Sequence, residues 1–139
     1  MSTATTTSEK TLNQKVGLAF GAVYVLVGIL GFLLAGGSDF VGKEGELLLG
    51  IFQVNGLHNV VHLLIGVALA GAAMSSPAAS RSTNLTVGVV YLLLGILGWF
   101  IVDTALNIVA LNAADHILHL LSGILLIVVA RGVGEPRMA

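Results

Sequence analysis

The sequence predicts an all-α membrane protein, a bundle of four transmembrane helices. Of its 139 residues, 56% are hydrophobic and 9% are charged, whereas a soluble domain carries about 25% charged residues. Four runs are almost free of charge, and each meets the length of roughly 18 apolar residues that a spanning helix needs. These runs cover residues 16–35, 47–73, 85–102 and 104–130. A pattern shared by the two halves indicates two tandem two-helix units.

The repeat is carried by matching residues at fixed spacings. The first and third runs share four residues at a spacing of 67, namely Gly21/Gly88, Tyr24/Tyr91, Gly28/Gly95 and Gly31/Gly98. The second and fourth runs share three at a spacing of 57, namely Asn55/Asn112, His62/His119 and Gly66/Gly123. Such a repeat constrains the fold strongly. Each unit, 16–74 and 85–131, has two spans, so both insert the same way up. We therefore expect a pseudo-twofold axis along the membrane normal.

Positive charges fall on one side of the predicted bundle. Five of the six Lys and Arg residues lie before the first run, between the second and third, or after the fourth, and Lys43 is the exception. Lys and Arg mark the cytoplasmic side, so both termini are expected in the cytoplasm. The prediction is a disordered tail over 1–15, a membrane domain over 16–131 and a second tail over 132–139. Residues 75–82 should form a cytoplasmic loop, and a tight turn near Asp103 should join the last two helices.

Polar side chains gather on one face of the second and fourth helices. At 100° per residue, the polar side chains of the second run other than Gln53 fall within an arc of about 100°, and the fourth run carries a matching face. An ionisable group at the bilayer centre costs roughly 2.5–3.5 kcal/mol or more. Both faces should therefore turn inward, with Asn55 and Asn112 as the most deeply buried amides. The predicted buried network comprises Tyr24, Asn55, His58, Asn59, His62, Tyr91, Asn112, Asp115, His116 and His119.

This network allows several interpretations. In the first, its members hydrogen-bond to one another and fix the helix register, as polar groups do between membrane helices. In the second, they converge on a transition metal such as zinc, iron or copper. The candidate ligands, paired one helical turn apart in each half, are His58, His62, Asp115 and His119. His62 and His119 would also suit the two sides of a haem. A proton, ion or solute pathway through Asp115 is the remaining alternative, and so small a chain would need to oligomerise for it.

Composition narrows the remaining classes of function. A net charge of −1 gives no basis for binding nucleic acid. The chain has no cysteine, which excludes disulfides and thiolate chemistry. It carries no nucleophile elbow, phosphate loop or paired catalytic carboxylates. The sequence thus predicts a non-enzymatic protein whose partner is the lipid bilayer. The sequence does not decide whether the protein binds no cofactor, a metal or a haem. It also leaves open whether the protein forms a homo-oligomer or joins a larger membrane complex.

The motif Asn55-x-x-His58-Asn59-x-x-His62-x-x-x-Gly66, after a glycine-rich first run, resembles an uncharacterised family of small four-helix membrane proteins common in actinobacteria. The resemblance extends from about Val16 to Arg131. It implies a location in the bacterial inner membrane and brings no known activity. The general plan also resembles that of DoxX-like membrane proteins.

Overall fold

Four helices and one small hairpin make up the described part of the chain, residues 9–35 and 39–132 of the computed structural model. In chain order the elements are α1 (Leu12–Leu34), β1 (Glu46–Leu48), β2 (Phe52–Val54), α2 (Gly56–Ser75), α3 (Pro77–Ile101) and α4 (Ala113–Ala130). Each helix is long and apolar enough to cross a membrane. The prediction of four helices of membrane-spanning character is therefore confirmed.

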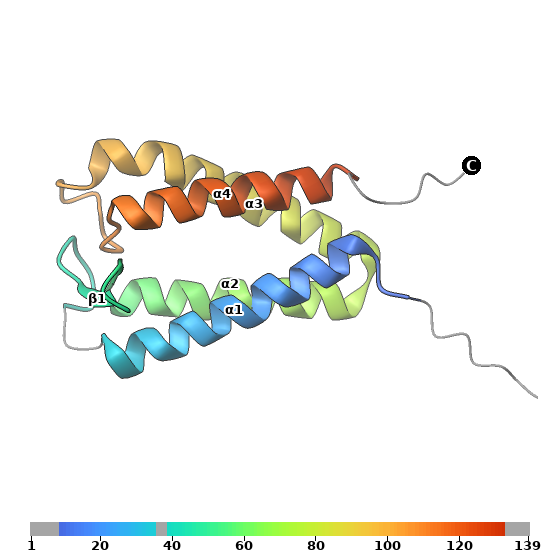
Figure 1. Cartoon of the computed structure of the whole chain (residues 1–139), viewed down its shortest axis with the longest axis horizontal. Coiled ribbons are helices and arrows are strands. Elements are labelled where there is room, and N and C mark those ends of the chain that lie inside the picture. The colour runs from blue at the N-terminus through green and yellow to red at the C-terminus, as the bar shows by residue number, and fades with distance from the viewer. Residues whose placement is uncertain (1–8, 36–38, 133–139) are drawn as a thin grey trace, which may run out of the picture.

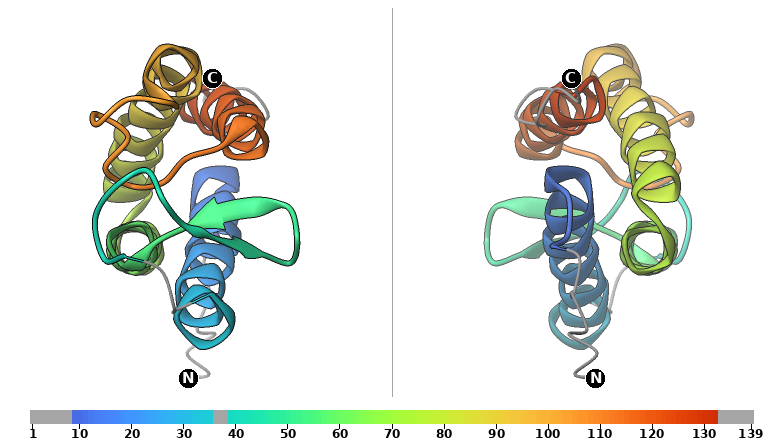
Figure 2. Two further views of the ribbon diagram at one scale, coloured as in Figure 1. Left: turned by 90° about the vertical axis from the view of Figure 1, so that its left-hand side faces the viewer. Right: turned by 90° about the vertical axis from the view of Figure 1, so that its right-hand side faces the viewer.

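The helices form two antiparallel pairs. α1 packs chiefly on α2, and α3 packs chiefly on α4, with fewer contacts between the first pair and the second pair. Figure 1 shows the first pair beneath the second. The two ends of the described chain lie with the α2–α3 connection at one end of the bundle, the terminal end, whereas the hairpin and residues 102–112 lie at the other, the loop end (Figure 1). Figure 2 looks onto the loop end in its left view.

Side-chain caps set the helix starts at the terminal end. Thr11 and Gln14 form a capping box, in which the Gln14 N–H donates to Thr11 Oγ1 over 3.3 Å and the Thr11 N–H to Gln14 Oε1 over 3.1 Å. The Ser76 side chain caps α3, and Pro77 occupies its first turn. α2 and α3 are thus separated by Ser76 alone, and Arg81 lies within a helix. The predicted loop over 75–82 is wrong, because the polar residues after Ser76 continue the helix beyond the apolar run.

The loop end also differs from the prediction. Residues 47–54 belong to an antiparallel hairpin in which Glu46 pairs with Val54 and Leu48 with Phe52. Residues 102–112 are not a tight turn near Asp103 but a longer irregular segment. Asn107 holds this segment, because its Nδ2 donates to the Leu111 carbonyl and its Oδ1 accepts from the Leu111 N–H, at 2.9 and 2.8 Å. The second and fourth apolar runs are long because each includes such a non-helical extension.

Glycines bring the two helices of each pair into backbone contact. A Cβ added at Gly21 would lie 2.8 Å from the Gly66 carbonyl oxygen, and one at Gly66 would lie 2.8 Å from the Gly21 carbonyl oxygen. In the second pair, a Cβ at Gly88 would lie 3.1 Å from the Gly123 oxygen, and one at Gly123 would lie 2.8 Å from the Gly88 oxygen. Small residues allow this approach, which favours helix association in lipid. Each pair is therefore a tightly packed unit.

Candidate metal centre

Three histidines meet between the two helix pairs. His58 and His62 stand one turn apart on α2, and His119 comes from α4. Each offers one ring nitrogen, and these three nitrogens all lie within 4.8 Å of one another. The side chains are 3%, 7% and 4% exposed, respectively. This histidine trio (His58, His62, His119) therefore joins the first pair to the second.

The rings of the trio are in close contact. The Nε2 atoms of His58 and His62 are 3.2 Å apart, and the two ring centroids are separated by 4.3 Å. The His58 and His119 centroids are 6.2 Å apart. Residues four apart on a helix share a face, which explains why His58 and His62 reach the same point. His119 approaches that point from the opposite pair.

Two tyrosines pack against the trio. The Tyr24 ring stacks on His62 with centroids 5.5 Å apart, and Tyr91 packs on His119 at 4.7 Å. The two tyrosine rings meet edge to face at 5.4 Å. Both tyrosines come from the glycine-rich helices α1 and α3, as the sequence predicted for the faces opposite the histidines. They restrict the orientation of the imidazoles through ring contacts.

The ring nitrogens of the trio are only partly satisfied. Within the described residues, the Nδ1 atoms of His58, His62 and His119 are buried and have no hydrogen-bond partner. The backbone carbonyls of Gln53 and Val109 face the His58 ring from the loop end, outside good hydrogen-bond geometry. A buried polar atom without a partner is costly. The trio therefore has unused bonding capacity.

Asp115 lies apart from the trio, although the sequence grouped it with these histidines. Its Oδ2 accepts hydrogen bonds from the Asn112 N–H over 2.9 Å and from the Gln53 N–H over 3.2 Å. Asp115 stands in the first turn of α4, where a carboxylate turns back to complete a capping box. The structure thus brings together three of the four candidate ligands and uses the fourth as a cap.

Asn55 and Asn112 are helix caps. Asn55 is fully buried, as Asn59 is, whereas Asn112 is only half-buried. Asn55 Oδ1 accepts from the His58 N–H over 2.9 Å, and Asn112 Oδ1 accepts from the Asp115 N–H over 3.0 Å. Asn55 Nδ2 also donates to the carbonyls of Gly42 and Ile108, each over 2.9 Å. The prediction missed this role because both residues sit inside long apolar runs, which conceal the start of the helix.

Asn59 and His116 fill spaces that glycines leave on the neighbouring helix. A Cβ at Gly31 would overlap the Asn59 amide, and one at Gly98 would overlap the His116 ring. Both polar side chains are fully buried, and their side-chain nitrogens, together with Asn59 Oδ1, have no partner in the described part of the chain. His116 also packs on Trp99 with ring centroids 5.2 Å apart. His116 is therefore a buried histidine outside the trio.

Two cavities flank the trio. The first, of about 310 Å³, lies between α1 and α4 and is lined by Tyr24, His62, Ser122 and apolar residues. The second, of about 290 Å³, lies between α2 and α3, and all three histidines of the trio line it together with Tyr91. The trio thus has open space on two sides, and the second cavity meets all of its members.

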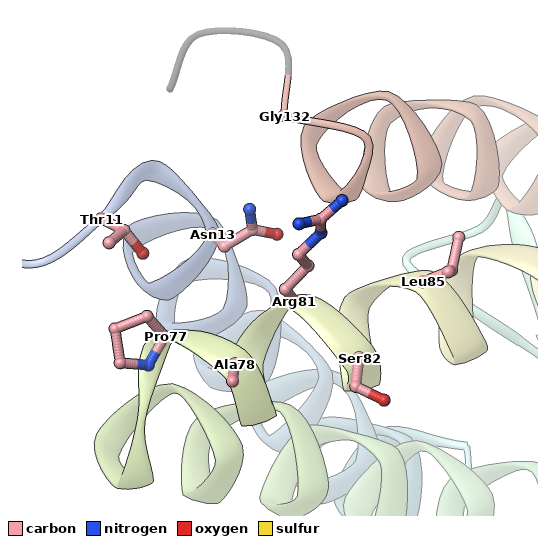
Figure 3. Close-up of a pocket in the computed structure, with 8 residues that line it drawn as sticks. All are labelled: Thr11, Asn13, Pro77, Ala78, Arg81, Ser82, Leu85 and Gly132. Carbon is pink, nitrogen blue, oxygen red and sulfur yellow. The ribbon is translucent and has the colours of Figure 1, made fainter. Parts of the chain in front are cut away.

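A further group of polar residues at the terminal end was not anticipated from the sequence. Asn84 Nδ2 donates to the Asn13 carbonyl over 2.9 Å, Gln14 Nε2 to the Ala73 carbonyl over 2.9 Å, and Arg81 Nε to the Ala130 carbonyl over 2.7 Å. Figure 3 shows Arg81 and Asn13 beside a cavity of about 560 Å³ at this end. These bonds tie the helix ends together. They escaped prediction because the residues lie outside or at the edges of the apolar runs.

Fold and site define a small helical protein with four potential membrane spans and a buried histidine cluster. The family model described as "Domain of unknown function (DUF4383)" matches residues 14–131. The chain belongs to this family, which agrees with the resemblance to an uncharacterised family. No curated protein and no solved structure matches the chain. The resemblance to DoxX-like proteins stays a prediction.

Proposed function

We propose that this chain is a multi-pass protein of the bacterial plasma membrane that holds a transition-metal ion at His58, His62 and His119. The observation that carries the proposal is the meeting of three buried ring nitrogens within 4.8 Å of one another. Imidazole is a good ligand for zinc, copper, iron and nickel. Three protein ligands with a free fourth position are typical of metal sites that bind or activate a further molecule.

The spacing of the nitrogens suits a metal. Two imidazole nitrogens at about 2.0–2.1 Å from a tetrahedral zinc ion lie roughly 3.4 Å apart. The Nε2 atoms of His58 and His62 are 3.2 Å apart. The nitrogen of His119 lies within 4.8 Å of the other two, so binding of the ion would draw it closer to them. The Gln53 and Val109 carbonyls beside His58 are suited to receive the N–H that a metal-bound imidazole presents on its other nitrogen.

The alternatives account for less of the geometry. In a purely structural network, His58 and His62 can share one hydrogen bond, but among the described residues no hydrogen bond joins His119 to either of them, although its ring nitrogen lies within 4.8 Å of theirs. A haem between His62 and His119 needs a wide slot for its macrocycle. Tyr24 and Tyr91, at 5.4 Å from each other and packed on these histidines, leave no such slot. A single ion is the ligand that fits the space.

Burying the charge of the ion is costly, since each buried ion loses several kcal/mol of solvation. Coordination by peptide ligands gives about 10–16 kcal/mol for structural zinc at neutral pH. That value is already net of the dehydration of the ion, so coordination by protein ligands can exceed the cost of burying it. Among the described residues the trio includes no carboxylate, so the site would carry the positive charge of the ion itself.

The two halves of the protein are proposed to be tandem repeats, related by a pseudo-twofold axis along the membrane normal, with both termini in the cytoplasm. Matching helix contacts support this. The spacings of 67 and 57 residues that relate the sequences also relate the neighbours of the glycines, namely Gly21–Gly66 with Gly88–Gly123, Gly66–Val25 with Gly123–Leu92, Gly28–Asn59 with Gly95–His116, and Gly31–Asn59 with Gly98–His116. Reporter fusions at Ala139 and near Lys43 should report opposite sides of the membrane.

The metal proposal is tested on protein purified in detergent and dialysed against Zn²⁺ or Co²⁺. Wild-type protein is expected to retain the metal stoichiometrically in elemental analysis. His119→Leu is expected to lose it. His116→Asn is the matched control, because His116 lies on the same helix outside the trio and Asn59 occupies the corresponding place in the first pair. Metal-free wild-type protein, or equal retention by the two variants, would contradict the proposal.

A further inference from the structure

The cavity between α2 and α3 is the space onto which the trio opens. Its volume is about 290 Å³, and its polar side chains are the three histidines and Tyr91. The rest of its lining consists of Val, Leu and Ile side chains from α2, α3 and residues 106–111. No charged side chain is among the described residues that line it. A site with apolar walls and a few convergent polar atoms is typical of small-molecule binding.

The cavity between α1 and α4 differs in how many histidines of the trio line it. It has a similar volume, about 310 Å³, and similar apolar walls, but His62 is the only member of the trio that lines it. Positions related by the repeat spacings line both cavities, including Val27 in the α1–α4 cavity and Leu94 in the α2–α3 cavity. A ligand in the α2–α3 cavity can therefore reach an ion held by all three histidines. A ligand in the α1–α4 cavity meets one histidine.

We propose that the α2–α3 cavity binds a small molecule with an apolar body that bears one oxygen or nitrogen donor, and that this donor occupies the fourth position on the metal. The inference rests on the proposed metal site and names the class of molecule that the site takes. Three imidazoles leave a fourth position free for a ligand. The aliphatic lining selects an apolar body, since it offers nothing to pair with a charge.

The size and surroundings of the cavity support this choice. Its volume of about 290 Å³ is close to the lower end of roughly 300–1,000 Å³ for ligand pockets. That suits a molecule of about one or two rings. The helices that form it have largely apolar outer surfaces with exposed side chains such as Leu64, Leu93 and Leu97. A lipid-soluble molecule is therefore the kind that would be concentrated beside it.

The test uses Co²⁺-loaded full-length protein in detergent, because the visible bands of Co²⁺ respond to a change in its ligands. The probe is 4-phenylimidazole, which has an apolar body and a donor nitrogen. The control probe is 1-phenylpyrrole, which has a similar shape without a free donor pair. We expect 4-phenylimidazole to change the Co²⁺ spectrum of the wild-type protein and 1-phenylpyrrole to leave it unchanged.

Two cavity-filling variants localise the binding. Leu94→Trp fills the α2–α3 cavity, and Val27→Trp places the same side chain at the matching position of the α1–α4 cavity. Leu94→Trp is expected to weaken 4-phenylimidazole binding by about tenfold or more, as loss of fit in an apolar pocket does, while still binding Co²⁺. Val27→Trp should bind the probe as the wild-type protein does. If Leu94→Trp does not fold, Leu94→Phe provides the smaller obstruction.

The outcomes separate this inference from the metal proposal. Protein that binds Co²⁺ but shows no spectral response to 4-phenylimidazole overturns the cavity inference and leaves the metal site standing. An equal loss of probe binding in Leu94→Trp and Val27→Trp, or a loss in Val27→Trp alone, also overturns it. A change of the Co²⁺ spectrum on adding 1-phenylpyrrole would also overturn it, because that probe has no donor to place on the metal. Protein that binds no Co²⁺ overturns both proposals.

Discussion

The first turns of α2 and α4 begin with the same cap and carry different functional side chains three residues later. Asn55 and Asn112 cap the two helices through the same kind of bond, from their Oδ1 to the N–H three residues later. That later residue is His58 in α2 and Asp115 in α4. Asp115 turns back and accepts the Asn112 N–H, whereas His58 points between the helix pairs and meets His62. The same position of the turn thus holds a candidate metal ligand in α2 and a capping carboxylate in α4.

The chemistry of the two side chains explains the difference. A carboxylate only accepts hydrogen bonds, and the free N–H groups of a helix start attract it. The two donors to Asp115 are the Asn112 N–H in its own helix and the Gln53 N–H in the hairpin. The carboxylate therefore also fastens the hairpin of the first half to the second pair. The imidazole of His58 instead packs against the rings of His62 and His119.

The largest expected effect follows from giving α2 the residue of α4. In His58→Asp, the new carboxylate should turn back toward Asn55, as Asp115 does toward Asn112. The trio would lose a ligand, and the affinity for Zn²⁺ should fall by about 100-fold or more, beyond the 10–100-fold typical of altered supporting residues. Competition with a chelator measures the change. Unchanged affinity would mean that the new carboxylate still points into the trio, and it would contradict the claim that the identity of this residue decides where its side chain points.

A second pair of variants concerns the glycines that receive Asn59 and His116. In Gly31→Ala the added methyl group overlaps the buried Asn59 amide, whereas nothing lies within 4 Å of a Cβ at Gly71. Overpacking of this kind costs about 1–3 kcal/mol. Gly31→Ala should therefore lower the midpoint of thermal unfolding in detergent, and Gly71→Ala should not lower it. Equal behaviour of the two variants would contradict the close packing of the first pair.

A smaller effect is expected at the cap of α4. In Asp115→Asn the side chain keeps its size but loses its charge, so its bonds to the Asn112 and Gln53 N–H groups weaken. Loss of a cap costs about 0.5–2 kcal/mol, and we expect a value near the lower end because one oxygen remains. Zn²⁺ retention should stay at the wild-type level, since Asp115 is outside the trio. Loss of zinc in this variant would indicate that Asp115 is a metal ligand after all, which would contradict its role as a cap alone.

Much of this fold follows from the sequence because hydropathy reports directly on membrane helices. The four runs locate α1 to α4, and helical periodicity places His58 and His62 on one face. The repeat spacing then relates His62 to His119, which the structure brings to the same place as His58. Burial explains these successes, because a polar side chain on a membrane helix is costly against lipid and therefore faces the interior of the bundle.

The remainder depends on interactions that hydropathy does not register. Residues 47–54 are as apolar as a helix, yet Leu49 and Gly50 adopt positive φ angles of 54° and 72° and turn the chain into a hairpin. Ser76 and Pro77 start α3 well before its apolar run. Most of the two predicted tails, residues 1–8 and 133–139, lies outside the described residues. Residues 12–15, assigned to a disordered tail, belong to α1.

The most direct test of the account is X-ray absorption spectroscopy on the Zn²⁺-loaded protein, which counts and identifies the ligands of the ion. Wild-type protein is predicted to show three imidazole nitrogens at about 2.0–2.1 Å. His119→Leu should show fewer imidazoles or no bound zinc, and His116→Asn should match the wild-type spectrum. A zinc shell without histidine, or a shell that His119→Leu leaves unchanged, would contradict a metal centre shared between the two helix pairs.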